Sequence, residues 1–282
     1  DNTNKDVKRT IDYKYSDGKT AQPTVNDSLH FERTVVIDKV TGKVSSDTWT
    51  PSQDFNDIQT PAVQGYTPDK AVVSDKNIDH NHDDIIEHVV YSPDKQTATI
   101  TYIDDTEKKT LGSDKQNGKF NQAITFEHDP AAKIASYEKQ GYVLVSNSFN
   151  NNKYQADDNN NVFYVHLKHD TKKVSRNDDV NMTVHYVMDD GSKAPSDSKQ
   201  TVNFTETGVK DKVTGKIAWT PADSQTLNDV PSPVLTGYTA DIKTAKGKAV
   251  NFGDPDINVT VHYSANAQTA KITYVDDVTK KT

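Results

Sequence analysis

The feature that most constrains this chain is an internal repeat with an offset of 172 residues. The stretch Tyr102–Thr110, Tyr-Ile-Asp-Asp-Thr-Glu-Lys-Lys-Thr, returns as Tyr274–Thr282, Tyr-Val-Asp-Asp-Val-Thr-Lys-Lys-Thr. Other landmarks return at nearly the same offset, and they are Gly65-Tyr66-Thr67 with Gly237-Tyr238-Thr239, Asp38–Lys43 with Asp211–Lys216, and Trp49 with Trp219. Such a unit is too long for a solenoid repeat, so each repeat is expected to hold more than one domain.

Composition favours small β domains over disorder. Only 33% of the 282 residues are hydrophobic, but they fall in alternating runs, which predicts strands with one buried face. The absence of cysteine excludes disulfides and thiolate metal sites. A net charge of −8 disfavours nucleic acid as a partner. Since no run of 18 apolar residues is present, no membrane insertion is expected within this stretch.

One kind of module is predicted twice, at residues 1–95 and 174–266. In each copy an opening strand alternates apolar residues and ends at an Asp-Gly turn, and a closing strand carries a Val-x-Tyr pair. In the first copy a longer strand is expected to turn Leu29, Phe31, Arg33, Val35 and Ile37 to one face. Thr50-Pro51 and Thr220-Pro221 predict a short helical turn, with threonine as N-cap. The paired landmarks are Ile11, Tyr13 and Tyr15 with Val184, Tyr186 and Met188, Asp17-Gly18 with Asp190-Gly191, and Val89 and Tyr91 with Val261 and Tyr263.

A different, middle module is predicted at residues 96–173. A strand over 98–102 is followed by a second strand through Phe120, Ala123 or Ile124, and Phe126. The stretch 129–141 then predicts a helix, with Asp129 as N-cap, Pro130 at the first position, Gly141 as the cap, and a stripe of Ala131, Ile134 and Tyr137. Strands over 142–145 and 162–167 complete the order ββαββ of a β-grasp fold. Residues 267–282 are expected to form the first strand of a further module of this kind, which would make the chain a piece of a longer array.

Several of these residues carry a family resemblance. The middle module, with Ile100–Asp105, Gln140-Gly141-Tyr142 and an aromatic closing strand, resembles the MucBP domain. The repeated module, with Asp-Lys-Val-Thr-Gly, Trp-Thr-Pro and Gly-Tyr-Thr, resembles the B2 domain of Mub repeats of lactobacillus cell-surface adhesins. The resemblance implies tandem β-grasp, ubiquitin-like modules arranged end to end as an elongated rod, mainly β or α+β. It also implies binding to mucin glycoproteins through their glycans and, in some members, to immunoglobulins.

Aromatic residues are the candidate glycan-binding residues, because an aromatic face can pack against the C–H groups of a sugar ring. Trp49 and Tyr66 recur as Trp219 and Tyr238. Core packing is the alternative for both pairs, since small domains gain much of their buried area from aromatic rings. The Asn-rich loop at 147–161, with Phe149 and Tyr154, is the third candidate surface, and its alternative is a disordered hairpin tip.

No cofactor is predicted. The two histidines and three aspartates of residues 79–84 have the right chemistry for a divalent metal ion, but the matching stretch 251–256 has no histidine, which favours a solvated loop. Residues 157–161 start like a calcium loop, Asp-x-Asn-x-Asn, yet Val162 and Lys168 replace its glycine and glutamate. Weak calcium binding by an acidic loop therefore stays open. Motifs for nucleophilic or metalloprotease catalysis are missing, so we do not expect an enzyme.

These observations together predict a monomeric adhesin fragment that binds host mucin through repeated weak contacts. We expect it outside the cell, attached to the wall of a Gram-positive bacterium, with the anchor and signal peptide elsewhere. Mucins are acidic, so adhesion should strengthen as carboxylates protonate toward about pH 5 and below. Two alternatives stay open, which are a module that binds immunoglobulin or another protein by pairing with a sheet edge, and a structural stalk.

Overall fold

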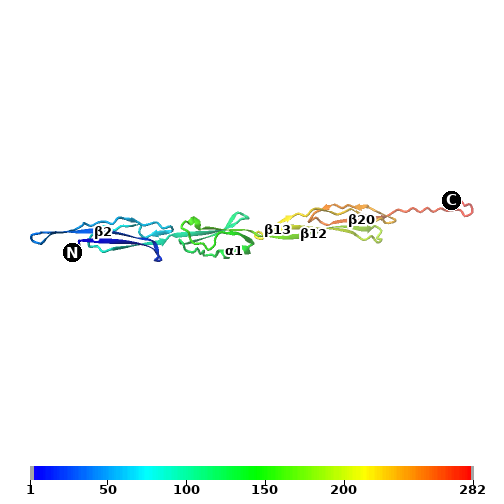
Figure 1. Ribbon diagram of the computed structural model, residues 1–282. Helices are drawn as coiled ribbons and strands as arrows, with labels where there is room; N and C mark the ends of the chain where they lie inside the picture. Colours follow the sequence, from blue (N-terminus) through cyan, green and yellow to red (C-terminus); the bar gives the residue numbers. More distant parts are fainter. Residues whose placement is uncertain (1–2, 281–282) are drawn as a thin grey trace. The chain divides into compact units, whose positions relative to one another are not determined.

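The structure, a computed structural model, describes residues 3–280 and divides into two compact units, Asp1–His169 and Asp170–Thr282. Figure 1 shows that each unit is made of long strands, and α1 is the only α-helix of the described residues. Unit 1 contains the first repeated module and the middle module, whereas unit 2 contains the second repeated module. The fold is mostly β, and the expected tandem arrangement of small β modules is confirmed.

The first repeated module is built on a five-stranded sheet in the order β3-β2-β1-β7-β5. The central strand β1 pairs antiparallel with β2 and parallel with β7. A short ladder of β4 and β6 packs its apolar side chains against this sheet. The strands are β1 Asn4–Tyr15, β2 Thr20–Ile37, β3 Val44–Trp49, β4 Ile58–Gln59, β5 Tyr66–Pro68, β6 Val72–Val73 and β7 Ile85–Pro93.

Alternation along the strands decides which side chains enter the core. Ile11 and Tyr13 of β1 are buried beside Val89 and Tyr91 of β7, which confirms the opening and closing strands. Phe31 of β2 is buried as well. However, Val35 and Ile37 at the end of β2, which were expected to share a face with Phe31, are 38% and 55% exposed. The register of β1 with β2 begins at Asn4 and Glu32, so this end of β2 pairs with β3 beyond the core.

The short helical turn predicted at Thr50-Pro51 does not form. The chain is irregular there, and Gln53 makes an isolated bridge with Ile78. The backbone N–H of Phe55 donates to the carbonyl of Asp75 at 3.0 Å. The matching prediction at residues 220–221 is also wrong, because β15, Gln225–Thr226, follows and pairs with β19, Ala249–Val250. Long-range pairing satisfies the backbone groups that a helical turn would have satisfied, and it overrides the local signal.

The middle module has a four-stranded sheet in the order β10-β11-β8-β9 with α1 against one face. Strand β11 runs parallel to β8, and the other pairs are antiparallel. The mixed sheet and the order ββαββ confirm the β-grasp prediction. The elements are β8 Lys95–Asp104, β9 Lys109–Lys119, α1 Pro130–Lys139, β10 Tyr142–Asn147, the 3-10 helix η1 Asp158–Asn161 and β11 Val162–His169.

The second strand of the middle module lies earlier in the sequence than predicted. Strand β9 ends at Lys119, and residues 120–126 form turns and a single bridge, although Ile124 and Phe126 are each only 5% exposed. The side chains of β9 are mostly polar, so its period of two is invisible in hydrophobicity. Buried apolar residues in the following loop produced the misleading signal.

Helix α1 forms where the sequence predicts it. The Asp129 carboxylate accepts from the backbone N–H groups of Ala131 and Ala132 at 3.3 and 3.2 Å, as an N-cap should. The cap at the other end is Gln140, and Gly141 follows with φ of +99°, a conformation that glycine adopts without strain. Of the predicted stripe, Ile134 is buried and Tyr137 half-buried. Ala131 is exposed, because Pro130 takes the buried position in the first turn.

The second repeated module repeats the first sheet, in the order β14-β13-β12-β20-β17. Val184 and Tyr186 of β12 are buried beside Val261 and Tyr263 of β20. Strand β12 begins at Thr171, so residues 171–173 pair with β13 and not with the module that was expected to end at residue 173. The strands are β12 Thr171–Met188, β13 Ser198–Asp211, β14 Ile217–Thr220, β15 Gln225–Thr226, β16 Val230–Pro231, β17 Tyr238–Ala240, β18 Thr244–Ala245, β19 Ala249–Val250 and β20 Ile257–Ala265.

The strand expected within residues 267–282 does not form over 267–280, and residues 281–282 lie outside the described residues. Its counterpart β8 is held between β9 and β11, and a strand without such neighbours has no ladder to join. The turn of the repeated motif nevertheless forms. The Asp276 carboxylate accepts from the N–H groups of Val278 and Thr279, as that of Asp104 does from Thr106 and Glu107. The motif therefore encodes a hairpin turn.

Candidate functional site

Trp49 is half-buried, and one face of its ring is occupied. The His80 imidazole stacks on it with 4.4 Å between ring centroids and an interplanar angle of 3°. The Arg33 guanidinium carbon lies 5.9 Å from the ring centroid, and Arg33 is held by Asp47 through contacts of 2.9 and 2.7 Å. This arrangement matches the core-packing alternative more closely than an open platform for a sugar.

Trp219 is covered by an arginine from a different strand. The Arg176 guanidinium carbon of β12 lies 4.5 Å from the ring centroids of both Trp219 and Phe252. Two nitrogens of Arg176 donate to one carboxylate oxygen of Glu206, at 2.8 and 2.6 Å. A cation over the tryptophan is thus common to both copies, whereas the strand that supplies it is not.

The histidine-rich loop at 79–84 does not gather its side chains around one point. The His82 ring nitrogen Nδ1 lies 2.9 Å from the Asp79 carboxylate, and this contact holds the pKa of Asp79 below its usual range. His80 instead stacks on Trp49, and Asp84 accepts from the backbone N–H of Lys8 at 2.9 Å. The loop therefore matches the predicted solvated connection.

Tyr66 joins the two modules of unit 1. Its ring centroid lies 4.7 Å from that of Tyr15 and 5.5 Å from that of Phe120, which belongs to the middle module. Gly65 has φ of +78°, and a Cβ atom on it would lie 2.5 Å from the Phe120 ring. The backbone N–H of Asp94 donates to the Gly65 carbonyl at 2.9 Å. The Gly-Tyr landmark therefore makes a tight joint within unit 1.

An open hollow of about 550 Å³ lies at this joint. Tyr15, Tyr66 and Phe120 contribute aromatic surface to it, and polar side chains complete its lining. The Tyr66 ring also packs against the rings of Tyr15 and Phe120. The remaining lining residues are Ser16, Asp17, Lys19, Pro93, Lys119, Asn121 and Gln122.

Tyr238 makes a different contact from Tyr66, its counterpart. Its hydroxyl donates to the Asp190 carboxylate at 2.7 Å, and this hydrogen bond is the main cause that lowers the pKa of Asp190. Gly237 has φ of +83°, close to that of Gly65, but a Cβ atom there would meet open space.

Phe149 and Tyr154 of the Asn-rich loop point into the middle module. Tyr154 is 1% exposed, so it is not available to a ligand, and the candidate assignment is wrong for this residue. It packs on Gly118, where a Cβ atom would lie 2.1 Å from its ring. Phe149 is half-buried, with ring centroids at 5.3 and 5.2 Å from Phe126 and Phe163. The loop is packed by its own aromatic residues.

The calcium-like stretch of this loop uses its side chains internally. Asn161 is fully buried, and its amide accepts from the Gln155 backbone N–H at 2.8 Å and donates to the Gln155 carbonyl at 3.1 Å. The Asp158 carboxylate accepts from the Thr97 backbone N–H at 2.9 Å, which ties the loop to β8. The departure from the calcium-loop pattern at Val162 agrees with this structural role.

The group Asp104, Glu107 and His169 does bring possible metal ligands within 4.8 Å of one another. One Asp104 carboxylate oxygen lies 3.0 Å from His169 Nε2, and the other accepts from the N–H groups of Thr106 and Glu107. Burial by itself would raise the pKa of Asp104, but these backbone hydrogen bonds and His169 together hold it below its usual range. The Glu107 carboxylate is paired with Lys109. The group therefore locks the β8–β9 turn to the end of β11.

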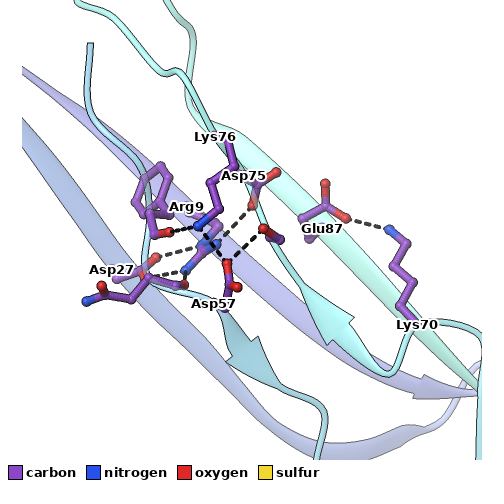
Figure 2. Close-up of polar contacts among 10 residues, drawn as sticks. Arg9, Asp27, Asp57, Lys70, Asp75, Lys76 and Glu87 are labelled. Atoms are coloured by element: carbon purple, nitrogen blue, oxygen red, sulfur yellow. Dashed lines mark hydrogen bonds and ion pairs between the residues drawn. The ribbon is translucent and has the colours of Figure 1, made fainter. Parts of the chain in front are cut away.

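A buried arginine in the first repeated module was missed by the sequence analysis (Figure 2). Arg9 of β1 is fully buried. It donates two hydrogen bonds to the Asp27 carboxylate at 3.0 and 2.6 Å, one to Asp75 at 3.0 Å and one to the Asn56 carbonyl at 2.9 Å. Its guanidinium carbon lies 4.4 Å from the Phe55 ring centroid. Four of the five N–H groups of this buried guanidinium therefore have an acceptor.

The second repeated module has an uncharged side chain at the position of Arg9. Met182 stands where Arg9 stands and pairs with Gln200, as Arg9 pairs with Asp27. Met182 and Leu227 are buried. Gln200 exchanges hydrogen bonds with the backbone of Asn228 at 2.9 and 3.0 Å. Gly247 occupies the position of the second aspartate, where a Cβ atom would lie 1.9 Å from the Leu227 carbonyl oxygen. The two copies share a backbone and differ in how they fill it.

The family described as a Muc B2-like domain matches residues 1–95 and 171–267, which is more than half of the chain. The chain belongs to this family. Its middle module, residues 96–169, matches the family described as a mucin binding domain. Both are adhesin-type domain families and not enzyme families.

One solved structure agrees with this assignment, and two others are similar to parts of the chain. A crystal structure named Mub-RV is 32% identical, with a TM-score of 0.55, over 61% of this chain and 100% of that chain. The type 2 repeat of the mucus binding protein MUB from Lactobacillus reuteri is 28% identical over the same shares of both chains, with a TM-score of 0.43. A MucBP domain from Lactobacillus acidophilus is 36% identical over 34% of this chain and 99% of that chain, with a TM-score of 0.31. None of the curated proteins compared with the chain matches it.

The Muc B2-like modules and the mucin binding domain between them identify the chain as a mucus-binding, adhesin-type repeat. Within residues 3–280, no helix is long and apolar enough to cross a membrane.

Proposed function

We propose that this chain binds the glycans of host mucins, weakly at each module and strongly through repetition. The match of the middle module, residues 96–169, to a mucin binding domain carries this proposal. The presence of two Muc B2-like modules in one chain supports it, because several weak sites on one tether gain affinity from their high effective concentration. The protein would act without catalysis, as a monomer on the outer surface of a Gram-positive cell wall.

Binding by this chain would rest on local contacts. Its net charge is −8, and mucins are acidic, so long-range attraction at neutral pH is not available. Hydrogen bonds to sugar hydroxyl groups and stacking on an exposed aromatic ring are the contacts that remain. Both Trp49 and Trp219 already stack on a neighbouring side chain, which makes them weaker candidates than their recurrence in the sequence suggests.

A second candidate function is capture of a protein by strand addition. Strand β10 is at the edge of its sheet, and its successive residues Val143, Leu144 and Val145 are 36%, 38% and 50% exposed. An edge of this kind can pair with an extended segment of immunoglobulin or another protein. Such a contact would not depend on sugars.

Removal of glycans from the ligand separates the two functions. Binding of the full chain is measured by surface plasmon resonance on immobilised mucin, on the same mucin after enzymatic O-deglycosylation, and on immobilised immunoglobulin. We expect binding to intact mucin and its loss after deglycosylation. Equal binding to both mucin surfaces, or binding to immunoglobulin alone, would replace the glycan proposal with strand addition. Failure to bind any surface would leave the stalk function.

A further inference from the structure

The four-stranded sheet of the middle module has one covered face and one uncovered face. Helix α1 lies on the covered face, where the ring centroids of Tyr102 and Tyr137 are 5.7 Å apart. The long loop packs on the same side through Phe149 and Phe163. Ala98, Ile100 and Tyr102 of β8 are fully buried there. The residues between them in the sequence must therefore point to the opposite face.

The register of the sheet shows which side chains share this opposite face. On β8 they are Thr97, Thr99 and Thr101, which lie across from Asn117, Lys115 and Ser113 of β9 and, for the last two threonines, from Val162 and Tyr164 of β11. We call these eight residues the open face. Side chains of directly paired residues lie on the same side of a sheet. The three threonines are partly exposed, and Ser113, Lys115 and Asn117 are exposed.

Tyr164 is the aromatic residue that the open face offers to solvent. It is 46% exposed, whereas Phe163 and Val165 on either side of it in the sequence are 5% and 0% exposed. Within residues 3–266 every other phenylalanine, tyrosine and tryptophan side chain is buried or half-buried, and Tyr274, at 83% exposed, lies in the segment without strands. An exposed aromatic ring in the middle of a sheet is not needed for packing.

The polar residues around Tyr164 are hydroxyl and amide groups held in place by one another. The Thr97 hydroxyl donates to the Asn117 amide oxygen at 3.0 Å, and the hydroxyls of Thr101 and Ser113 lie 3.4 Å apart. A hydroxyl group both donates and accepts hydrogen bonds, and so does a side-chain amide. The three threonines of β8 span about 13 Å at the rise of a strand. A row of such groups beside an aromatic ring suits a ligand that is itself rich in hydroxyl groups and has apolar C–H faces.

The charges of this surface narrow the ligand further. Six members of the open face carry no charge at neutral pH, so contact with an uncharged sugar removes no water from a charged side chain. They are Thr97, Thr99, Thr101, Ser113, Asn117 and Tyr164. Lys115 on β9 is the charged member of the open face. Lys168 lies further along β11 on the same side, beyond His166, whose Nδ1 is 2.8 Å from the Asp105 carboxylate. These cations complement the acidic character of a mucin, in contrast to the net charge of −8 for the whole chain.

We infer that the open face of the middle module is an oligosaccharide-binding surface, on which Tyr164 stacks against a sugar ring and the threonine row with Asn117 binds the hydroxyl groups of a mucin O-glycan. This inference rests on the proposed function and names the surface that performs it. It replaces the six candidate aromatic residues with a residue that the sequence analysis did not single out.

Binding of released mucin O-glycans to the full chain tests this surface without avidity. The substitution Tyr164→Ala is expected to weaken the affinity about three- to tenfold, the size of an aromatic stacking contribution, whereas Tyr164→Phe keeps the ring and should retain most of it. The pair Thr99→Val and Thr101→Val keeps the shape and removes two hydroxyl groups, and it should weaken binding as well. Tyr274→Ala, which removes an exposed tyrosine outside the sheet, is the matched control and should change nothing.

Amide chemical shifts recorded during the same titration give a second readout and confirm that each variant is folded. Shifts are expected in β8, β9 and β11 of the wild-type chain and not in β12. If the wild-type chain binds glycosylated mucin but Tyr164→Ala binds as tightly, or if the shifts lie elsewhere, the open face is not the site. If the wild-type chain does not bind the glycans at all, the proposed function itself fails.

Discussion

The first repeated module has Arg9 at the position where the second has Met182, and this difference allows a quantitative prediction about the stability of the first module. Arg9→Met introduces the residue of the second copy at that position, but it leaves Asp27 and Asp75 without their cation. Arg9 is fully buried, while the side chains of Asp27 and Asp75 are 32% and 15% exposed. Removal of one partner from a buried ion pair costs about 3–5 kcal/mol, and the lower end applies because these carboxylates still reach water.

Replacement of the whole network should recover most of this loss. The triple variant Arg9→Met, Asp27→Gln and Asp75→Gly carries the three residues found at Met182, Gln200 and Gly247. An apolar replacement of a buried ion network of similar volume is often neutral or stabilising. Since Phe55 now packs against the Arg9 guanidinium at 4.4 Å, a fourth change, Phe55→Leu, completes the set. We expect the quadruple variant to be within about 1 kcal/mol of the wild-type chain, the range seen for swaps that conserve volume.

Native-state hydrogen exchange measures this effect in the intact chain, because β1 reports on the altered module and β12 is an internal reference. A loss of about 3 kcal/mol corresponds to a roughly hundredfold faster exchange of the protected amides in β1. Exchange in β12 should not change. An acceleration of less than tenfold for Arg9→Met would show that the ion network contributes little to stability. If the quadruple variant is no more stable than Arg9→Met, the uncharged core of the second copy depends on residues other than these four.

Three further predictions concern other parts of the chain. Gly65→Ala and Gly237→Ala carry the same cost of about 1–2 kcal/mol for a left-handed backbone, but only Gly65→Ala places a Cβ atom 2.5 Å from Phe120; thermal unfolding should show a larger loss for Gly65→Ala, and equal losses would contradict the tight joint. The pKa of Asp104 is lower in the folded state than in the unfolded chain. Its contribution to stability is therefore present above its unfolded pKa of about 4 and is lost as the pH falls through the folded value. Urea titrations should show that the middle module loses stability in this pH range and that Asp104→Asn makes its stability less dependent on pH. Adhesion to mucin should strengthen toward about pH 5 and below as carboxylates protonate. Because Asp79, Asp189 and Asp190 have lowered pKa values and stay ionised longer, most of the increase in adhesion should come at the acidic end of this range. Adhesion that is unchanged or weaker in acid would refute the idea that charge repulsion limits binding at neutral pH.

Strands with a period of two were predictable from the sequence wherever one face is apolar. The alternation of Ile11 and Tyr13, and of Val184 and Tyr186, locates β1 and β12 directly. Strand β9 has mostly polar side chains, and only its pairing with β8 makes it a strand. The Thr50-Pro51 signal was overridden for a related reason, because the backbone of that segment pairs with residues 75–78.

The candidate site depended on information that local patterns do not contain. Tyr154 looked like a loop-tip residue, yet it fills the space that Gly118 leaves on a strand 36 residues away. Arg9 finds Asp75 at a separation of 66 residues, and no spacing rule connects them. Tyr164 lies in a strand with apolar or aromatic residues at successive positions, Val162 to Val165, so its orientation could be assigned only once the helix had been placed on the other face.

The contrast between Arg9 and Met182 also bears on how two homologous modules of one chain avoid exchanging strands. Tandem domains of similar sequence are prone to domain-swapped misfolding while they fold on one polypeptide. If β12 took the place of β1, Met182 would leave two carboxylates without a cation; if β1 took the place of β12, Arg9 would enter an apolar core that holds a glutamine and no carboxylate at these positions. The difference at this one position therefore destabilises an exchanged central strand in either module and favours the native pairing.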